Sequence, residues 1–428
     1  MADDSSVISP HEAVLRVQSG DRIVVPMGDE PTTLLLALSA RKEELRGVEL
    51  NLGAPLFPFP FYEEGWEDSF RVSLNYVFPA VRQLVTDGAA DYIPVLLSRD
   101  AKAADEGRPG TRPYDVAMTV VGPPDERGMC SLGAKAWNKR DLIRGAKLTI
   151  VEVDAGAIRT YGDNAIHISE LDVLVEHQPI ETPTRDLTPP ADAQAIVEQL
   201  KEIVRDGDAV QIGAGSLTSN LAVLGAFDGH RDLGFHSEVM PEGVPTLVEA
   251  GVINGSRKAF LPGVAVTTAA FVPAAELELM QMNPKFEIHP SRTVLDPTNI
   301  AANENVLAIN AALTVDLSGQ IAADSIGDRQ WSGPGGQPDF AIGAMLSKGG
   351  RFVVMLPSTA AGGTVSRIQP MLDTWVTVPR YLSDIVITEY GIAQLAGKNM
   401  RQRAEELIAV AHPDFRDELR RKVGRSKD

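Results

Sequence analysis

Residues 207–215 read GDAVQIGAG, a short, mainly apolar run framed by glycines. The run is too short for a helix, and glycine on each side indicates a turn at each end. The segment therefore predicts a buried strand that ends in a glycine-rich turn. In an open α/β sheet, such a turn lies where ligands bind, beyond the carboxyl end of the strand.

The first half of the chain contains the same pattern 187 positions earlier. Gly20 corresponds to Gly207, and Gly28 corresponds to Gly215. The correspondence continues without a gap to Gly47. We interpret it as a duplicated strand–turn–helix–strand unit. Because glycine and leucine are common residues, chance matching is the alternative.

Extending the comparison by four positions brings out one difference between the halves. Residues 48–51 read VELN and residues 235–238 read FHSE, so Asn51 corresponds to Glu238. A site built onto one of two similar scaffolds would leave a carboxylate in one copy only. Glu238 is therefore a candidate functional residue.

A proline-rich segment divides the chain. Between residues 178 and 191, four prolines lie among Thr and Asp residues, and no helix or strand pattern persists there. We expect an N-terminal domain in residues 1–180, a linker in residues 181–191 and a C-terminal domain in residues 192–428. In both halves, short β-branched runs alternate with helical patterns, which predicts two similar open α/β domains with mostly parallel sheets. The expected strands include 22–25, 116–120, 148–153, 306–310, 352–356 and 385–388, and the expected helices include 10–18 and 136–145.

The composition is that of a folded protein of enzyme size. Apolar residues make up 44% and charged residues 23% of the 428 residues, close to the averages for globular proteins. The net charge of −18 repels phosphate backbones, so we expect no nucleic-acid partner. No apolar run approaches the roughly 20 residues of a membrane helix, and the N-terminus lacks a signal-peptide pattern. We therefore expect a cytoplasmic protein with no membrane partner.

The single cysteine, Cys130, has no evident base beside it in the sequence, and we interpret it as structural rather than nucleophilic. One cysteine cannot form an intrachain disulfide or a cysteine-based zinc site. The seven histidines show no H-E-x-x-H pattern, so we expect no metal site. The absence of a G-x-S-x-G motif weakens the hypothesis of a serine hydrolase.

Three glycine-rich segments are candidate ligand contacts: residues 213–220, 332–340 and 360–364. The first follows a strand and is expected to open a helix, whose free N–H groups can bind an anion. Each segment has a plain alternative as a tight turn or a surface loop. Composition and motifs alone stop at a two-domain α/β protein that binds a phosphorylated ligand.

Ordered motifs along nearly the whole chain resemble one known family. They include ADYIP at 90–94, RTYGD at 159–163, HSE at 236–238, TEYG at 388–391 and AHPDF at 411–415. The sequence resembles the acetyl-CoA hydrolase/transferase family, which includes acetate, butyrate and 4-hydroxybutyrate CoA-transferases.

The resemblance implies that Glu238 attacks an acyl-CoA, which gives first an acyl-glutamyl anhydride and then a glutamyl-CoA thioester. It implies oxyanion donors at Gly335 or Gly336 and at Asn310. The substrates would be acyl-CoA and small carboxylic acids, with no permanently bound cofactor, and the protein would be a homodimer or a higher homo-oligomer. The implied CoA contacts are Gly213, Ala214, Gly215, Ser216, Leu217, Leu313, Gly336 and Gly363.

Departures from the family pattern bear on the substrate. Lysines expected near Ala361 and Thr364 are absent, which removes positive charge that could reach CoA phosphates or an acid substrate. Ser237 stands where the family often has threonine, a change that keeps the hydroxyl. The aromatic stretch 56–62 either lines an acyl pocket or packs in the core, and we favour packing. Acyl-CoA hydrolysis by the same glutamate is the alternative activity, because water exclusion depends on packing around the site.

Overall fold

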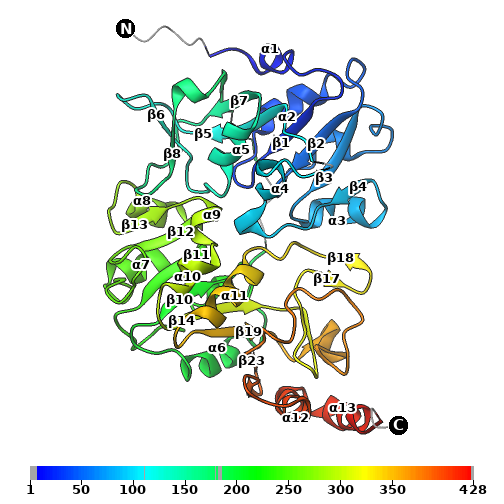
Figure 1. The fold of residues 1–428 in the computed structure, drawn as a ribbon, viewed down its shortest axis with the longest axis vertical. Coiled ribbons are helices and arrows are strands. Elements are labelled where there is room, and N and C mark those ends of the chain that lie inside the picture. The colour runs from blue at the N-terminus through cyan, green and yellow to red at the C-terminus, as the bar shows by residue number, and fades with distance from the viewer. Residues whose placement is uncertain (1–6, 110, 179, 182–185, 426–428) are drawn as a thin grey trace. The chain divides into compact units, whose positions relative to one another are not determined.

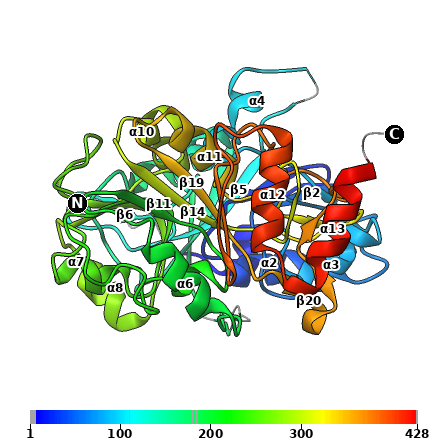
Figure 2. The same cartoon turned by 90° about the horizontal axis from the view of Figure 1, so that it is seen from below.

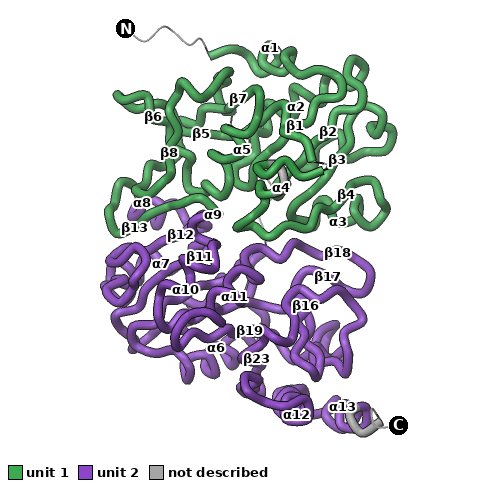
Figure 3. Tube along the Cα trace, in the orientation of Figure 1, with its two compact units in different colours: residues 1–185, 281–292 green, residues 186–280, 293–428 purple. Residues whose placement is uncertain are grey.

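The computed structural model of the chain contains two compact units (Figure 3). Unit 1 comprises residues 1–185 and 281–292, and unit 2 comprises residues 186–280 and 293–428. Each unit is built on an open, largely parallel sheet with helices against it (Figure 1). The residues that the structure describes are 7–109, 111–178, 180–181 and 186–425.

Unit 1 is built on a seven-stranded sheet in which all paired strands run parallel. A parallel sheet is covered on both faces, which explains why an interior strand such as Val116–Val121 is buried along its whole length. From edge to edge the strands are β4 (Ala90–Tyr92), β3 (Phe70–Leu74), β2 (Val48–Leu52), β1 (Arg22–Val25), β5 (Val116–Val121), β7 (Leu148–Val153) and β9 (Val173–Glu176).

The two helices expected in the first half are shorter than predicted. The helix expected at 10–18 ends at Val14, because the N–H groups that follow bond three residues back and tighten the chain into turns. The helix expected at 136–145 begins only at Lys139, because Trp137 has a φ of 32° that a helix cannot contain. The helices of unit 1 are α1 (Pro10–Val14), α2 (Thr32–Ser39), α3 (Pro79–Thr86), α4 (Lys102–Asp105) and α5 (Lys139–Gly145), with an antiparallel pair β6 (Met129–Ser131) and β8 (Ala165–His167).

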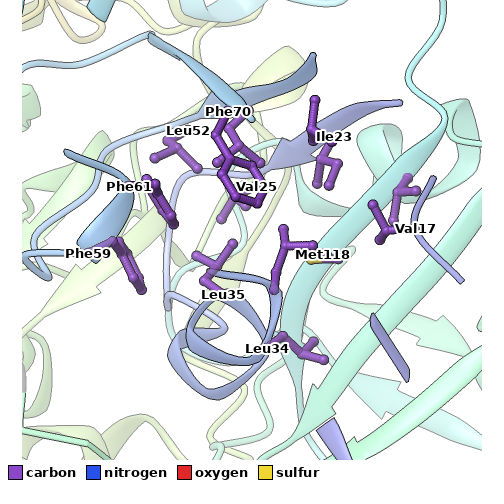
Figure 4. Close-up of a cluster of buried hydrophobic side chains, with 14 of the residues drawn as sticks. Val17, Ile23, Val25, Leu34, Leu35, Leu52, Phe59, Phe61, Phe70 and Met118 are labelled. Carbon is purple, nitrogen blue, oxygen red and sulfur yellow. The ribbon is translucent and has the colours of Figure 1, made fainter. Parts of the chain in front are cut away.

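The core of unit 1 packs side chains of β1, β2, β3 and α2 against the aromatic stretch 56–62 (Figure 4). Phe59 and Phe61 are 2% and 3% exposed. Their rings stack with centroids 5.0 Å apart. The preference for core packing over an acyl pocket is confirmed for these two rings.

Residues 281–292 belong to unit 1 although they come late in the sequence. The Met282 N–H donates to the carbonyl of Arg159 at 2.9 Å, and the Ile288 N–H donates to the carbonyl of Tyr161 at 3.0 Å. The sequence patterns do not predict this return. The strand in this segment is β13 (Phe286–Ile288).

Unit 2 repeats the topology of unit 1. Its strands are, in order, β12 (Ala265–Phe271), β11 (Gly234–Pro241), β10 (Ala209–Ile212), β14 (Val306–Ala311), β19 (Arg351–Met355), β23 (Ile385–Thr388) and β24 (Gly391–Gln394). All these pairs are parallel except β23 with β24. The order β12-β11-β10-β14-β19-β23 corresponds to β3-β2-β1-β5-β7-β9. The predicted class of two similar, mostly parallel α/β sheets is confirmed, and the repeated order supports the duplication.

Helices and small sheets complete unit 2. In the described part of the chain, no helix is both long and apolar enough to cross a membrane. Helices α12 and α13 lie side by side near the C-terminus (Figure 2). The helices are α6 (Ala193–Lys201), α7 (Val244–Glu249), α8 (Ala274–Met280), α9 (Ser291–Val294), which begins within unit 1, α10 (Pro297–Ala301), α11 (Gln337–Leu346), α12 (Met400–Val410) and α13 (Pro413–Arg425). The short strands are β15 (Thr314–Asp316), β16 (Ile321–Ala322), β17 (Ser325–Ile326), β18 (Arg329–Gln330), β20 (Thr359–Ala360), β21 (Val365–Ser366) and β22 (Ile368–Gln369).

The expected domain limits stay a prediction, because compact packing does not show that each part folds alone. Residues 179 and 182–185 of the proline-rich segment lie outside the described residues. Cys130 is buried, and burial raises the pKa of its thiol to about 11. A thiol that holds its proton this firmly is a poor nucleophile, which supports the structural interpretation of Cys130.

The carboxyl group of Glu30 in unit 1 has a pKa well above its ordinary value. Glu30 accepts hydrogen bonds from the N–H groups of Leu56 and Phe57, each at 3.1 Å. Burial raises the pKa of Glu30 to about 7, although these two hydrogen bonds act in the opposite direction. The folded protein therefore holds the Glu30 proton more tightly than the unfolded chain does.

The Glu30→Gln substitution tests this shift. Between pH 4.5 and 7 the unfolded chain loses the Glu30 proton while the folded protein retains it, so the wild-type free energy of unfolding falls as pH rises through this window. The glutamine variant lacks this decline, so its stability relative to wild type should be higher at pH 8 than at pH 5. Urea unfolding at both pH values measures the difference, with the exposed Glu64→Gln as control. An equal difference at both pH values would contradict the assignment.

Candidate active site

Glu238 lies on β11, between β12 and β10 in the unit 2 sheet, and is half-buried. Its carboxylate oxygen Oε2 accepts a hydrogen bond from the Gly336 N–H at 2.6 Å. Gly336 is the N-cap of α11, so the carboxylate lies at the end of the helix where the partial charge is positive. A hydrogen bond to an ionised acceptor is stronger than a neutral one.

The two glycines beside the carboxylate are required by space. A Cβ on Gly336 would lie 2.8 Å from Glu238 Oε2 and 2.7 Å from Leu295 Cδ2, and both distances are shorter than real Cβ contacts. Gly335 has a φ of 55°, and a Cβ there would lie 3.2 Å from the same oxygen. Glycine at these positions lets the backbone approach the carboxylate.

The neighbours of Glu238 hold its strand in place. Ser237 is fully buried, and its hydroxyl donates to the carbonyl of Ile212 at 3.0 Å and accepts from the N–H of the same residue at 3.1 Å. His236 is 3% exposed and bonds through Nε2 to the carbonyl of Val294 at 2.7 Å. Of the three residues in this motif, His236 and Ser237 are buried and only Glu238 is partly exposed.

The turn after β10 differs from the prediction. The segment expected to open a helix at 213–220 contains only a three-residue 3₁₀ turn at Thr218–Asn220. Asn220 Nδ2 donates to the carbonyl of Ser216 at 2.7 Å, and this side-chain bond competes with helical backbone bonding. The expectation of a helix N-terminus here is wrong. Of the five predicted contacts, Ala214 and Ser216 are exposed, Gly213 and Gly215 are half-buried, and Leu217 is buried.

Asn310 lies near the carboxyl end of β14, directly across from the turn at Gly213. Its side chain is 4% exposed and forms two hydrogen bonds with Gln211. β10 and β14 are neighbours at the position where the strand order changes direction. Open α/β sheets bind ligands at this position.

Leu313 and the turn that contains Gly363 are linked by a residue that the sequence reasoning missed. Arg367 donates from Nε to the carbonyl of Thr359 at 3.1 Å and from a terminal nitrogen to the carbonyl of Leu313 at 3.0 Å. Gly363 itself is exposed, with a φ of 89° in the turn that follows Thr359. Burial lowers the pKa of the Arg367 guanidinium. A lone arginine in a loop carries no sequence signal that would have identified it.

The loop after β19 is fixed at its start by Glu389, part of the TEYG motif. The carboxylate of Glu389 accepts from the backbone N–H of Ser358 at 2.9 Å and from the Ser358 hydroxyl. Ser358 is fully buried. The motif therefore has a structural role in unit 2: it holds the strand-end loop that leads to residues 359–363.

The predicted site residues thus fall into three groups. Glu238, Gly335 and Gly336 meet directly, and Asn310, Gly213 and Gly215 lie at adjacent strand ends. Leu313 and Gly363 belong to neighbouring loops. Among the described residues, no group of three or more His, Cys, Asp or Glu side chains is placed to hold a metal ion.

The fold is that of an open α/β protein, and its candidate site is a half-buried carboxylate that accepts from a glycine N–H on an interior strand of the sheet. Comparison with known proteins gives the family. Residues 4–184 match the acetyl-CoA hydrolase/transferase N-terminal domain, and residues 275–423 match its C-terminal domain. The chain belongs to the acetyl-CoA hydrolase/transferase family.

Individual relatives extend over nearly the whole chain. The chain is 38% identical to the 4-hydroxybutyrate coenzyme A transferase of Clostridium kluyveri, over 96% of each protein. It is also 38% identical to the succinyl-CoA:cyclohexane-1-carboxylate CoA transferase of Geobacter metallireducens, over 96% of this chain and 94% of that protein. The crystal structure of RipA from Yersinia pestis has a TM-score of 0.88 at 32% identity and covers 99% of this chain and 98% of its own. The prediction of an enzyme of the CoA-transferase type is confirmed.

The contact between Gly336 and Glu238 can be tested with Gly336→Ala. The added Cβ has to displace the carboxylate or Leu295, and a shift of about 1 Å at a reacting group costs on the order of 100-fold in turnover. Steady-state exchange of CoA between two acids measures the loss, and thermal unfolding shows whether the fold survives. Gly145→Ala, where a Cβ meets nothing within 4 Å, should leave turnover unchanged. Full activity of the Gly336 variant would contradict the geometry.

Proposed function

We propose that this CoA-transferase moves CoA from an acyl-CoA to a free carboxylic acid by a ping-pong reaction in which Glu238 is the nucleophile. The observation that carries the proposal is the 2.6 Å hydrogen bond from the Gly336 N–H to the Glu238 carboxylate. In the proposed reaction, negative charge develops on an oxygen of the Glu238 side chain. A hydrogen-bond donor this close can stabilise that charge.

The proposed reaction begins when a Glu238 oxygen attacks the thioester carbonyl carbon. A C–O bond forms, the C–S bond breaks, and CoA thiolate leaves behind an acyl-glutamyl anhydride. The thiolate sulfur then attacks the glutamyl carbonyl carbon, and the first acid leaves as a carboxylate. A second carboxylate attacks the resulting glutamyl-CoA thioester, and the two steps run in reverse. A carboxylate needs no general base for this chemistry at neutral pH, and the activated acyl bond is conserved throughout.

The glycine donors suit the second step in particular. When the thiolate attacks the glutamyl carbonyl, the negative charge develops on the Glu238 oxygen itself, which becomes the oxyanion. Gly336 already donates to that side chain, and Gly335 is adjacent. The Asn310 carboxamide is the proposed second donor. Donors that are fixed before the reaction need no reorganisation while it proceeds.

The turn at 213–217, together with Leu313, Gly336 and Gly363, is the proposed contact surface for CoA. Two observations support it. The backbone at Gly213 and Gly215 packs closely against the end of β14, where an added Cβ would lie 2.8 Å from Asn310 Oδ1 and 3.4 Å from Ala311 Cβ, respectively. Arg367 places a guanidinium between Leu313 and the turn before Gly363. This arginine supplies a positive charge near the loop in which the expected lysines are missing.

The remaining parts of the proposal come from family likeness. The named relatives act on 4-hydroxybutyrate and cyclohexane-1-carboxylate, and we place the acids of this chain among small carboxylic acids. A reaction through Glu238 needs no permanently bound cofactor. A homodimer or higher homo-oligomer and a cytoplasmic location complete the proposal.

Trapping the thioester tests the role of Glu238. Enzyme loaded with acyl-CoA and then treated with borohydride should contain Glu238 reduced to an alcohol, which peptide mass spectrometry detects. Glu238→Gln should lower turnover by at least about 1,000-fold, because the covalent route is lost. Glu242→Gln removes an exposed carboxylate from the same segment and should have no effect. An active enzyme with an unmodified Glu238 would rule out the mechanism.

Transfer and hydrolysis are distinguished by the acceptor. With acyl-CoA alone, a transferase releases at most one equivalent of carboxylic acid per site and keeps CoA bound as the glutamyl thioester, whereas a hydrolase releases free CoA continuously. Addition of a second carboxylate should start steady exchange with parallel-line, ping-pong kinetics. Continuous CoA release at an unchanged rate with and without acceptor would favour hydrolysis instead.

A further inference from the structure

Two buried amide side chains near the carboxyl ends of β10 and β14 bond to each other. Asn310 Nδ2 donates to Gln211 Oε1 at 2.9 Å, and Gln211 Nε2 donates to Asn310 Oδ1 at 3.3 Å. Gln211 is 2% exposed and Asn310 is 4% exposed. We infer that Gln211 is a positioning residue that orients the Asn310 carboxamide toward the reacting glutamate, an inference that rests on the proposed function.

The pair is an exception within an otherwise apolar pair of strands. Val210, Ile212, Leu307 and Ile309 fill the adjoining positions of β10 and β14, and each is at most 1% exposed. Burying an amide costs free energy unless its hydrogen bonds are replaced. An apolar pair would fill this space without that requirement, so the presence of two amides calls for a reason beyond packing.

The backbone around the pair is shaped to admit it. A Cβ on Gly213 would lie 2.8 Å from Asn310 Oδ1, so glycine leaves room for the carboxamide. β10 and β14 run parallel, with Ile212 opposite Ile309, which brings Gln211 and Asn310 together near the carboxyl end of the sheet. The Ser237 hydroxyl bonds to both backbone groups of Ile212. This bond connects the strand of Gln211 to the strand of Glu238.

A reciprocal amide pair fixes which way a carboxamide points. Each amide uses its carbonyl oxygen and one of its two N–H groups, so the other N–H of Asn310 is left to point away from Gln211. Because Asn310 Oδ1 accepts from Gln211, the remaining N–H becomes a stronger donor through cooperative polarisation. Without Gln211, the carboxamide could rotate and present its oxygen to a developing oxyanion, which repels it.

The Gln211→Met substitution tests the inference, because methionine fills similar space without an amide. Loss of one orienting hydrogen bond should lower kcat about tenfold, whereas KM for acyl-CoA should change by less than about twofold, because bound CoA does not depend on the oxyanion donor. Gln211→Asn keeps a buried amide but is too short to reach Asn310, and it should show the same loss. It keeps the test available if the methionine variant does not fold.

A double-mutant cycle separates positioning from packing. If Gln211 acts through Asn310, then Gln211→Met should lower kcat in wild type but change it by less than about twofold in the Asn310→Ala background. Gln330→Met is the control, because it removes another buried amide of unit 2, which bonds to the carbonyl of Ser332. Any effect of this substitution on kcat should be equal in the wild-type and Asn310→Ala backgrounds. Thermal unfolding of each variant controls for loss of fold.

The outcomes distinguish this inference from the function on which it rests. Equal losses from Gln211→Met in both backgrounds, or a Gln211→Asn variant as active as wild type, would overturn the positioning role and leave the function intact. If Asn310→Ala itself turns over at the wild-type rate, then Asn310 is not the oxyanion donor and the positioning role also falls. An unlabelled Glu238 in the borohydride experiment would instead remove the covalent mechanism.

Discussion

A single hydrogen bond, from the N–H of Gly336 to the carboxylate of Glu238, places demands on three parts of unit 2. To bring a backbone amide within 2.6 Å of a side chain 98 positions away, the chain turns at Gly335 with a φ of 55°. Helix α11 then starts at once, so that its positive end faces the carboxylate. Finally, β11 has to hold Glu238 at the right place, and the hydrogen bonds of His236 and Ser237 fix this strand in the core. Loop, helix and strand are therefore determined together, and none can be altered alone.

The two sheets differ at the strand position that holds the proposed nucleophile in unit 2. Asn51, the counterpart of Glu238, is 5% exposed and has its amide satisfied within unit 1: it donates to Ser73 and accepts from Tyr114, both at 3.1 Å. Glu238 is only half-buried and meets a backbone donor instead. The same strand position thus serves packing in one unit and holds the proposed nucleophile in the other.

The sequence predicted what depends on local patterns. Parallel strands are continuous apolar runs, so the strands expected around 22–25 and 306–310 are present in the structure almost unchanged. Glu238 stood out by internal comparison, although its role as nucleophile came from family resemblance. Side-chain bonds such as Asn220 to Ser216 replaced the expected helix with turns. The pairing of Gln211 with Asn310 joins residues 99 positions apart, and no local pattern encodes such a contact.

The membership of residues 281–292 in unit 1 has a consequence for how the chain is made. The ribosome finishes the rest of unit 1 at residue 185 but supplies its last segment only after a long stretch of unit 2. At about 5–20 residues per second, the delay is on the order of ten seconds. During that time the backbone groups of Arg159 and Tyr161 lack their partners. The nascent chain must therefore keep an unfinished first unit soluble while the second unit emerges, so the two units cannot complete folding in simple succession.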